Sequence, residues 1–376
     1  MPTETIRLNG TVRARTPDDT WSIIAPHLPR YGITRIADLT GLDHLGLPVS
    51  TAIRPGARTL AASQGKGATD RLAAISAAME AIELWHAEQP LPVDQYGSAQ
   101  DLNPPYPLWS LPVRVPHPGL AHLPLEWTTG TGLTTGRPTP VPTRLISRAP
   151  RTMWTPDVLR ATSTGLACGN TREEALLHAL YEVIERDVLH TDEMRDGALR
   201  RLIRPATVDD PYARTLIDRL HQRQVLLELA AVEGPYGIPV CLAYLWSEDY
   251  PAWFAGSGCD TDPAIALTRA ITEAAQSRLT CIAGTRDDLP SRDEVFDTSP
   301  PAPKAAAAAT SWNQLADGPA LADTFADQVQ AIAGRLQDVT GYEPIAVTLS
   351  GPDDPLAAVK VIAPGARSRT RRAIPR

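Results

Sequence analysis

The strongest pattern of apolar and polar positions runs through residues 169–190, GNTREEALLHALYEVIERDVLH. Pairs of apolar residues recur there every four positions, which is typical of an amphipathic helix. Thr171 and Glu174 form a capping-box signature, so we predict a helix from about 172 to 190. Residues three and four positions apart share one face of a helix, and this face carries His178, Glu182, Glu185 and Arg186.

A second segment, residues 65–88, also pairs an apolar stripe with polar residues at helical spacing. It starts with a Gly-Lys-Gly turn around Lys66, continues through a helix cap at Thr69 or Asp70, and then becomes rich in alanine. One side of the predicted helix carries Ser76, Glu80 and Glu83, at positions i, i+4 and i+7.

A third segment, residues 259–280, begins with Asp262 as the expected cap and Pro263 at the first helical position. Arg269, Glu273 and Gln276 again fall at positions i, i+4 and i+7. Each of the three helices would therefore turn its apolar side to a core and its polar side to a shared cavity.

The rest of the chain reads as short strands and loops around these helices. Residues 1–20 are polar and predicted to be loose, and prolines crowd into residues 90–156, where they favour short edge strands and ordered loops. An exposed connection at 286–312 precedes a predicted helix near 321–339. These patterns predict a mixed α/β (α+β) fold, with sheets packed against amphipathic helices in one domain over 21–365. The last predicted elements are strands at 345–350 and 359–364 and a basic tail at 366–376.

The composition is that of a globular protein, with 43% hydrophobic and 21% charged residues, and with 36 prolines among 376 residues. The net charge of −7 gives no general attraction to nucleic acid or to an anionic membrane, so neither is an expected partner. With no signal peptide and no run of 18 apolar residues, we expect a cytoplasmic protein. The four cysteines lack Cys-x-x-Cys spacing, which favours buried free thiols. A homodimer is among the oligomeric states that the sequence leaves open.

Four glutamates on two of the predicted helices would repel one another if they converged without cations. Mg²⁺ prefers oxygen ligands, commonly one or two carboxylates together with substrate phosphates, so these helices suit metals that hold a nucleoside triphosphate. Lys66, Arg186 and Arg269 would add positive charge to the phosphates. The alternative is that each Glu-x-x-Glu is only the solvated face of a helix, and the Gly-Lys-Gly turn lacks the rest of a P-loop. The four glutamates are Glu80, Glu83, Glu182 and Glu185.

Taken together and in this order, the segments resemble the YcaO family. The resemblance runs from near residue 30 to 365 and includes GITRIADLTGLDHLGLPVSTAIRP, SQGKG, STGLACGNTREEALLHALYEVIERD, DPAIALTRAITEAAQSRL and VKVIAPG. It implies an unusual α/β fold that binds ATP, with the phosphates held by carboxylate-bound Mg²⁺. Leu84 departs from the family, which often has an arginine after this Glu-x-x-Glu. The implied metal ligands are Glu80, Glu83, Glu182 and Glu185, and the implied nucleotide-binding residues are Lys66, Ser76, Arg186, Arg269, Glu273 and Gln276.

The resemblance also implies an activity, the ATP-dependent activation of a peptide backbone amide. A nucleophile adds to the carbonyl carbon, the oxyanion attacks the γ-phosphate of ATP, and phosphate then leaves. A Cys, Ser or Thr side chain would give an azoline, sulfide a thioamide, and an amine an amidine. The C-terminus lacks the Pro-x-Pro-x-Pro of azoline-forming members, and AAQSRLTCIAGTRDDL resembles members encoded beside TfuA proteins. We therefore expect a thioamide in a ribosomally made precursor peptide, with a TfuA-like partner that delivers sulfur.

The sequence leaves the catalytic base and the mode of peptide capture open. No leader-binding module is evident, so a partner protein or an edge strand in the proline-rich stretch at 90–150 is expected to bind the peptide, the latter by strand addition. A non-catalytic ATP-binding accessory protein is the alternative from another functional class, because a fold does not guarantee chemistry.

Overall fold

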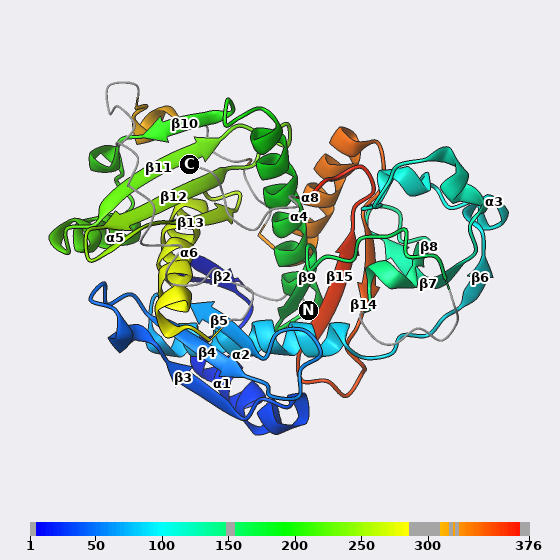
Figure 1. The fold of residues 1–376 in the computed structure, drawn as a ribbon, viewed down its shortest axis with the longest axis horizontal. Coiled ribbons are helices and arrows are strands. Elements are labelled where there is room, and N and C mark those ends of the chain that lie inside the picture. The colour runs from blue at the N-terminus through cyan, green and yellow to red at the C-terminus, as the bar shows by residue number, and fades with distance from the viewer. Residues whose placement is uncertain (1–4, 148–154, 286–308, 316–318, 320–322, 369–376) are drawn as a thin grey trace.

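The structure is a computed structural model that describes residues 5–147, 155–285, 309–315, 319 and 323–368. In these ranges the chain forms sheets of two, three, four and six strands with long helices packed against them, which confirms the predicted mixed α/β class (Figure 1). No helix within them is long and apolar enough to cross a bilayer. The predicted tail beyond 368, most of the predicted connection at 286–312 and part of the proline-rich stretch lie outside the described residues.

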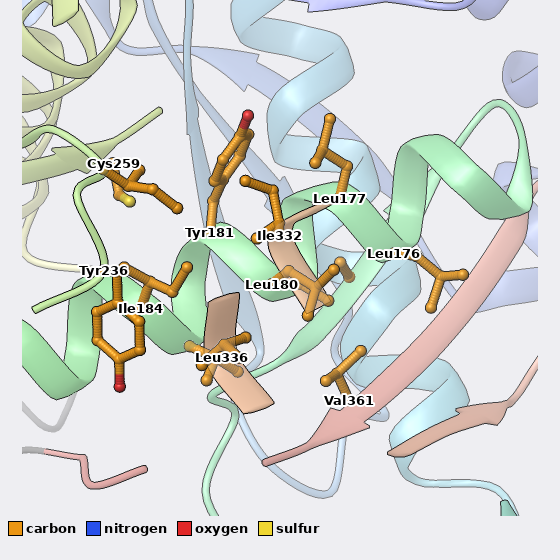
Figure 2. Packing of buried hydrophobic residues seen from close by; sticks show 14 of the residues in the cluster. Leu176, Leu177, Leu180, Tyr181, Ile184, Tyr236, Cys259, Ile332, Leu336 and Val361 are labelled. Carbon is orange, nitrogen blue, oxygen red and sulfur yellow. The ribbon is translucent and has the colours of Figure 1, made fainter. Parts of the chain in front are cut away.

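Helix α4 (Arg172–Met194) runs through the middle of the molecule and anchors its largest core (Figure 1). As predicted, the Thr171 side chain caps it by accepting the Glu174 N–H at 3.2 Å, and the helix continues one turn beyond the expected end. Its apolar face packs against α8 (Phe325–Thr340), which confirms the helix expected near 321–339 with a later start. The side chains that meet there include Leu180, Ile184, Ile332, Leu336 and Val361 (Figure 2).

A six-stranded antiparallel sheet joins distant parts of the chain. Its order is β6–β7–β14–β15–β9, and β8 pairs with the opposite side of β7. The predicted C-terminal strands are confirmed as β14 and β15, with β15 starting two residues earlier than expected. The strands are β6 (Gln95–Gly97), β7 (Leu125–Gly132), β8 (Pro138–Pro142), β9 (Leu166–Gly169), β14 (Ile345–Thr348) and β15 (Ala357–Ile362).

A four-stranded antiparallel sheet follows chain order and supports the third polar helix. Helix α6 (Pro263–Ala283) starts at the predicted Asp262 cap and packs closely on β13, because glycines face it. A Cβ atom at Gly256 would lie only 2.2 Å from the carbonyl oxygen of Ala270. The other elements are β10 (Arg200–Ile203), β11 (Leu226–Val232), β12 (Val240–Ser247), β13 (Tyr250–Cys259) and α5 (Pro211–Gln222).

A three-stranded sheet of β3 (Arg35–Asp38), β4 (Val49–Ile53) and β5 (Ala62–Lys66) supports the second polar helix, α2 (Asp70–Ala87). Thr69 is its cap and accepts the Leu72 N–H at 3.2 Å. Gly65 in β5 allows the close approach of the helix, since a Cβ there would lie 2.0 Å from the backbone nitrogen of Ala77.

The expectation of a loose N-terminus is wrong for residues 5–20. They form a hairpin of β1 (Ile6–Leu8) and β2 (Thr11–Arg13), followed by the start of α1 (Pro17–Ile24). The buried Glu174 carboxylate of α4 holds this segment by accepting the Ala14 N–H at 3.1 Å and by pairing with Arg13 at 3.2 Å. These partners are some 160 residues away in sequence, so no local pattern reveals them.

The proline-rich stretch forms short strands, the four-residue helix α3 (Ala99–Leu102) and loops at one end of the molecule (Figure 1). In strand β8, Pro138, Pro140 and Pro142 alternate with Thr139 and Val141, whose backbone N–H groups face β7. Its outer edge therefore has no N–H groups, which disfavours strand addition at β8 and leaves β6 as the edge suited to it.

The cysteines are free thiols, with Cys168, Cys241 and Cys259 buried and Cys281 half-buried.

Candidate functional site

Helices α2, α4 and α6 come together near the middle of the molecule, where α2 crosses below the other two in the view of Figure 1. Carboxylates on their polar stripes interact with one another there. Electrostatic repulsion between carboxylates connects the three helices. Each glutamate whose pKa is raised is repelled by a glutamate on the neighbouring helix or on the next turn of its own helix. The continuous line of neighbours is Glu80, Glu83, Glu182, Glu185 and Glu273.

The two glutamates of α4 are held by donors from other elements. The backbone N–H of Gly165 donates to Glu182 at 3.1 Å, and the Ser257 hydroxyl of β13 donates to Glu185 at 2.7 Å. Arg186 lies 3.7 Å from Glu182 and 3.8 Å from Glu185, so it partly neutralises both carboxylates. These contacts fix the two carboxylates in place before any ligand binds.

Glu83 of α2 approaches the end of β9, where the Cys168 N–H donates to it at 2.8 Å. Burial raises the pKa of Glu83 well above its ordinary value, and the nearby Glu80 and Glu182 raise it further. Burial also raises the pKa of the Cys168 thiol, which fits the predicted structural role rather than a reactive one. The α2 and α4 carboxylates thus share one small region.

Lys66 and α6 form the opposite side of the cluster. The Lys66 ammonium at the end of β5 donates to Glu273 at 2.7 Å. Burial alone would raise the pKa of Glu273, but Lys66 and Arg186 outweigh burial and hold this pKa below its ordinary value. The other predicted residues, Ser76 and Gln276, lie on α2 and α6 one turn from Glu80 and Glu273 respectively.

The two carboxylates of α4 lie in an environment that disfavours their charged forms. Burial raises the pKa of both Glu182 and Glu185, and Arg186 opposes this in each case without reversing it. Burial would lower the pKa of Arg186, but the surrounding glutamates raise it instead. In the described part of the chain, the cations that act on the five carboxylates of this cluster are Lys66, Arg186, Arg269, Lys360 and Arg13.

This donor set fits Mg²⁺. The ion takes oxygen ligands, and a divalent cation would offset both the burial and the repulsion that raise the pKa of Glu83, Glu182 and Glu185. The alternative that each Glu-x-x-Glu only faces solvent does not describe Glu185, which is buried against Ser257.

A second polar cluster lies one to two turns earlier along α4. His178 contacts the Arg13 guanidinium of the N-terminal hairpin, and burial together with Arg13 and Arg269 lowers its pKa well below the ordinary value. His178 is therefore a packed, hydrogen-bonded histidine. Beside Arg269, burial raises the pKa of Asp260 to about 6.

Several neighbours of the carboxylates were absent from the sequence prediction, namely Arg13, Gly165, Ser257 and Lys360. Ser257 had a usable signal, because it lies between two glycines at the end of an apolar run, where a backbone or ligand commonly approaches closely. Arg13 and Lys360 had none, since each reaches the cluster from a segment far away in the sequence.

A family model described as YcaO cyclodehydratase, ATP- and Mg²⁺-binding, matches residues 64–367. The chain belongs to the YcaO family. ATP and Mg²⁺ are accordingly the cofactors of this domain. An uncharacterised protein from Mycobacterium tuberculosis is 37% identical over 97% of this chain and 84% of its own length. A Rhizobium leguminosarum bv. trifolii protein, named for its place in the tfuA 3′ region, is 34% identical over 94% of this chain and 88% of its own.

Several solved structures share the fold. The YcaO protein of Methanopyrus kandleri, bound with AMPPCP and Mg²⁺, superposes with a TM-score of 0.74 at 21% identity and full coverage of both chains. A heterocyclase in complex with substrate and cofactor gives 0.73 at 21% identity over 98% of this chain and 55% of its own. The E. coli microcin synthetase McbBCD complex gives 0.63 at 13% identity over 88% and 87%. The fold is therefore that of ATP-dependent, cyclodehydratase-like YcaO proteins.

Proposed function

We propose that this protein uses ATP to activate a backbone amide of a ribosomally made peptide and replaces its oxygen by sulfur. The observation that carries the proposal is the convergence of carboxylates from α2, α4 and α6 beside Lys66 and Arg186. We assign Mg²⁺ to Glu80, Glu83, Glu182 and Glu185, and the nucleotide to Lys66, Ser76, Arg186, Arg269, Glu273 and Gln276.

The chemistry asks for positive charge around an oxyanion and around a transferred phosphoryl group. Mg²⁺ supplies much of that charge when it is bound. Lys66 and Arg186 are held in place by Glu273 and by the glutamates of α4, so their cations are oriented before the nucleotide arrives. ATP then meets fixed cations rather than flexible surface side chains.

In the proposed reaction, hydrosulfide forms a C–S bond at the amide carbon, and the carbonyl π electrons move to the oxygen. This oxygen attacks the γ-phosphorus of ATP, and the bond from that phosphorus to ADP breaks. The C–O bond then breaks, phosphate leaves, and the S–H proton is transferred to phosphate. Amide, hydrosulfide and ATP become thioamide, ADP and hydrogen phosphate, with no oxidant or reductant.

The thioamide product is favoured over an azoline by one finding among the relatives. The Rhizobium leguminosarum protein is named for its position beside tfuA, and it aligns over most of both chains. We propose a TfuA-like partner that delivers the sulfur. The family description as a cyclodehydratase favours azoline formation as the second candidate, in which a peptide side chain is the nucleophile.

The test combines purified protein, its precursor peptide, Mg·ATP and sodium sulfide, and follows the peptide by mass spectrometry. We expect a mass gain equal to one exchange of oxygen for sulfur per thioamide, with one ADP formed for each. Loss of one water without sulfide would show azoline formation instead, and would contradict the thioamide assignment.

Two variants separate an enzyme from an accessory protein. Glu80→Gln and Glu185→Gln keep the size of the side chain but remove a charge, so we expect both to lose peptide-dependent ADP formation while remaining folded. Glu248→Gln, in the exposed turn between β12 and β13, is the control and should retain full activity. If product yield is unchanged in both cluster variants, the protein is an accessory ATP-binding protein.

A further inference from the structure

A small pocket lies beside the carboxylate cluster, between β15, α4 and the segment that precedes β9. Its volume is about 30 Å³. A cavity of about 10–15 Å³ on the same measure holds one water. The pocket therefore has room for a ligand of very few atoms.

The pocket is lined by cations and hydroxyl groups. Arg160 and Arg367 are exposed at its mouth, and the Lys360 side chain lines it from a buried position on β15. Hydroxyl groups of Thr164 and Ser368 add hydrogen-bonding capacity, and these two contact each other at 3.0 Å. Among the described residues that line it there is no carboxylate, so its charge selects a small anion.

The same lysine connects the pocket to the proposed metal site. The Lys360 ammonium donates to the carbonyl oxygens of Thr162 and Thr164 at 2.6 and 2.7 Å, and its charge offsets part of the rise that burial causes in the pKa of Glu182. The next residue after Thr164 is Gly165, whose N–H donates to Glu182. Pocket and carboxylate cluster therefore share one wall.

We infer that this pocket binds the hydrosulfide anion that attacks the activated peptide amide. The inference rests on the proposed function, because it names the site of the nucleophile for that reaction. The two exposed arginines would stabilise the anion, and Lys360 would add positive charge from the wall that the pocket shares with the carboxylate cluster. The rest of the reaction is the balanced sequence given above, which ends in thioamide, ADP and hydrogen phosphate.

The experiment measures the KM for sulfide, ATP and peptide, with sodium sulfide as the sulfur source. Arg160→Ala and Arg367→Ala change exposed side chains and should leave the fold intact. We expect each to raise the KM for sulfide about tenfold, as for loss of a hydrogen bond to a charged group, without changing the KM for ATP. Arg114→Ala, at an exposed arginine that does not line the pocket, is the matched control.

The possible outcomes are distinguishable. If the wild-type protein forms no thioamide from sulfide, the proposed function and the pocket assignment are both wrong. If it forms thioamide but Arg160→Ala and Arg367→Ala leave the KM for sulfide unchanged, only the pocket assignment is wrong. If only the KM for peptide rises, the pocket binds the peptide. If only the inhibition by inorganic phosphate changes, the pocket binds phosphate. Either result would overturn our inference.

Discussion

At the scale of single residues, the carboxylates of the site are held by hydrogen-bond donors from elsewhere in the fold. Gly165 holds Glu182, Cys168 holds Glu83, and Ser257 holds Glu185. Groups that orient metal ligands in this way commonly change metal affinity by about 10–100-fold when they are removed. The donors are therefore as informative to mutate as the carboxylates.

Ser257→Ala tests this orientation. The hydroxyl donates to Glu185 at 2.7 Å and lies 3.5 Å from Glu273, so its loss should weaken the affinity for Mg²⁺ with a non-hydrolysable ATP analogue about tenfold. Isothermal titration calorimetry measures that affinity. Ser277→Ala, whose hydroxyl bonds to the Ala255 carbonyl, should bind as the wild type does. Equal affinity in both variants would show that Ser257 does not position Glu185.

Asp260 predicts a pH dependence of stability. Burial raises its pKa from 3.8 to about 6, so between these pH values the folded protein binds more protons than the unfolded chain. The free energy of unfolding should therefore fall as the pH rises through this window, by up to about 3 kcal/mol from this group. Asp260→Asn should remove that part of the decrease in urea unfolding of the metal-free protein. A variant curve parallel to the wild type would contradict the assignment.

At the scale of elements, glycines in strands determine how closely the polar helices pack. Gly65 of β5 faces α2, and Gly256 and Gly258 of β13 face α6, each with space for a hydrogen but not for a Cβ atom. The helices consequently lie close to their sheets, and the side chains on their polar faces reach a common region. A small displacement of α6 would separate Glu273 from Lys66.

Gly256→Ala should force α6 away from β13, because the new Cβ would meet backbone atoms of the helix at 2.2–2.3 Å. We expect a loss of about 3 kcal/mol in the free energy of unfolding, as for overpacking of a core, and weaker Mg·ATP binding. Gly334→Ala, in α8 with nothing within 4 Å, is the control and should stabilise the protein by about 0.5–1 kcal/mol. Chemical denaturation measures both, and equal effects would contradict the packing argument.

The sequence revealed the helices of the site better than their surroundings. Periodic apolar positions and local caps such as Thr171 and Asp262 are encoded within a few residues, so the helices and their polar faces could be predicted. The partner of Lys66 lies 207 residues away, and Arg13 reaches Glu174 across 161 residues. Such contacts depend on the packing of sheets, and the N-terminal hairpin was missed for that reason.

At the scale of the whole molecule, the net charge of −7 includes a group of carboxylates that repel one another in the folded state. Mg·ATP should therefore stabilise the protein, by about 2.7 kcal/mol at a hundredfold excess over Kd. ATP with a chelator should give little stabilisation, because the phosphates would face the carboxylates without a metal. Differential scanning fluorimetry measures the shift in Tm, and equal shifts with and without Mg²⁺ would contradict the proposed metal site.

The position of β14 and β15 between β7 and β9 has a consequence for biosynthesis. Strand β9 follows the loop whose Gly165 N–H donates to Glu182, and β9 pairs with β15. This pairing can form only after β15, which ends at Ile362, has left the ribosome. Contacts this distant in sequence form slowly, and the unpaired backbone edges of β7 and β9 stay exposed until then. A nascent chain that ends before β14 should therefore depend on chaperones and should not yet hold ATP.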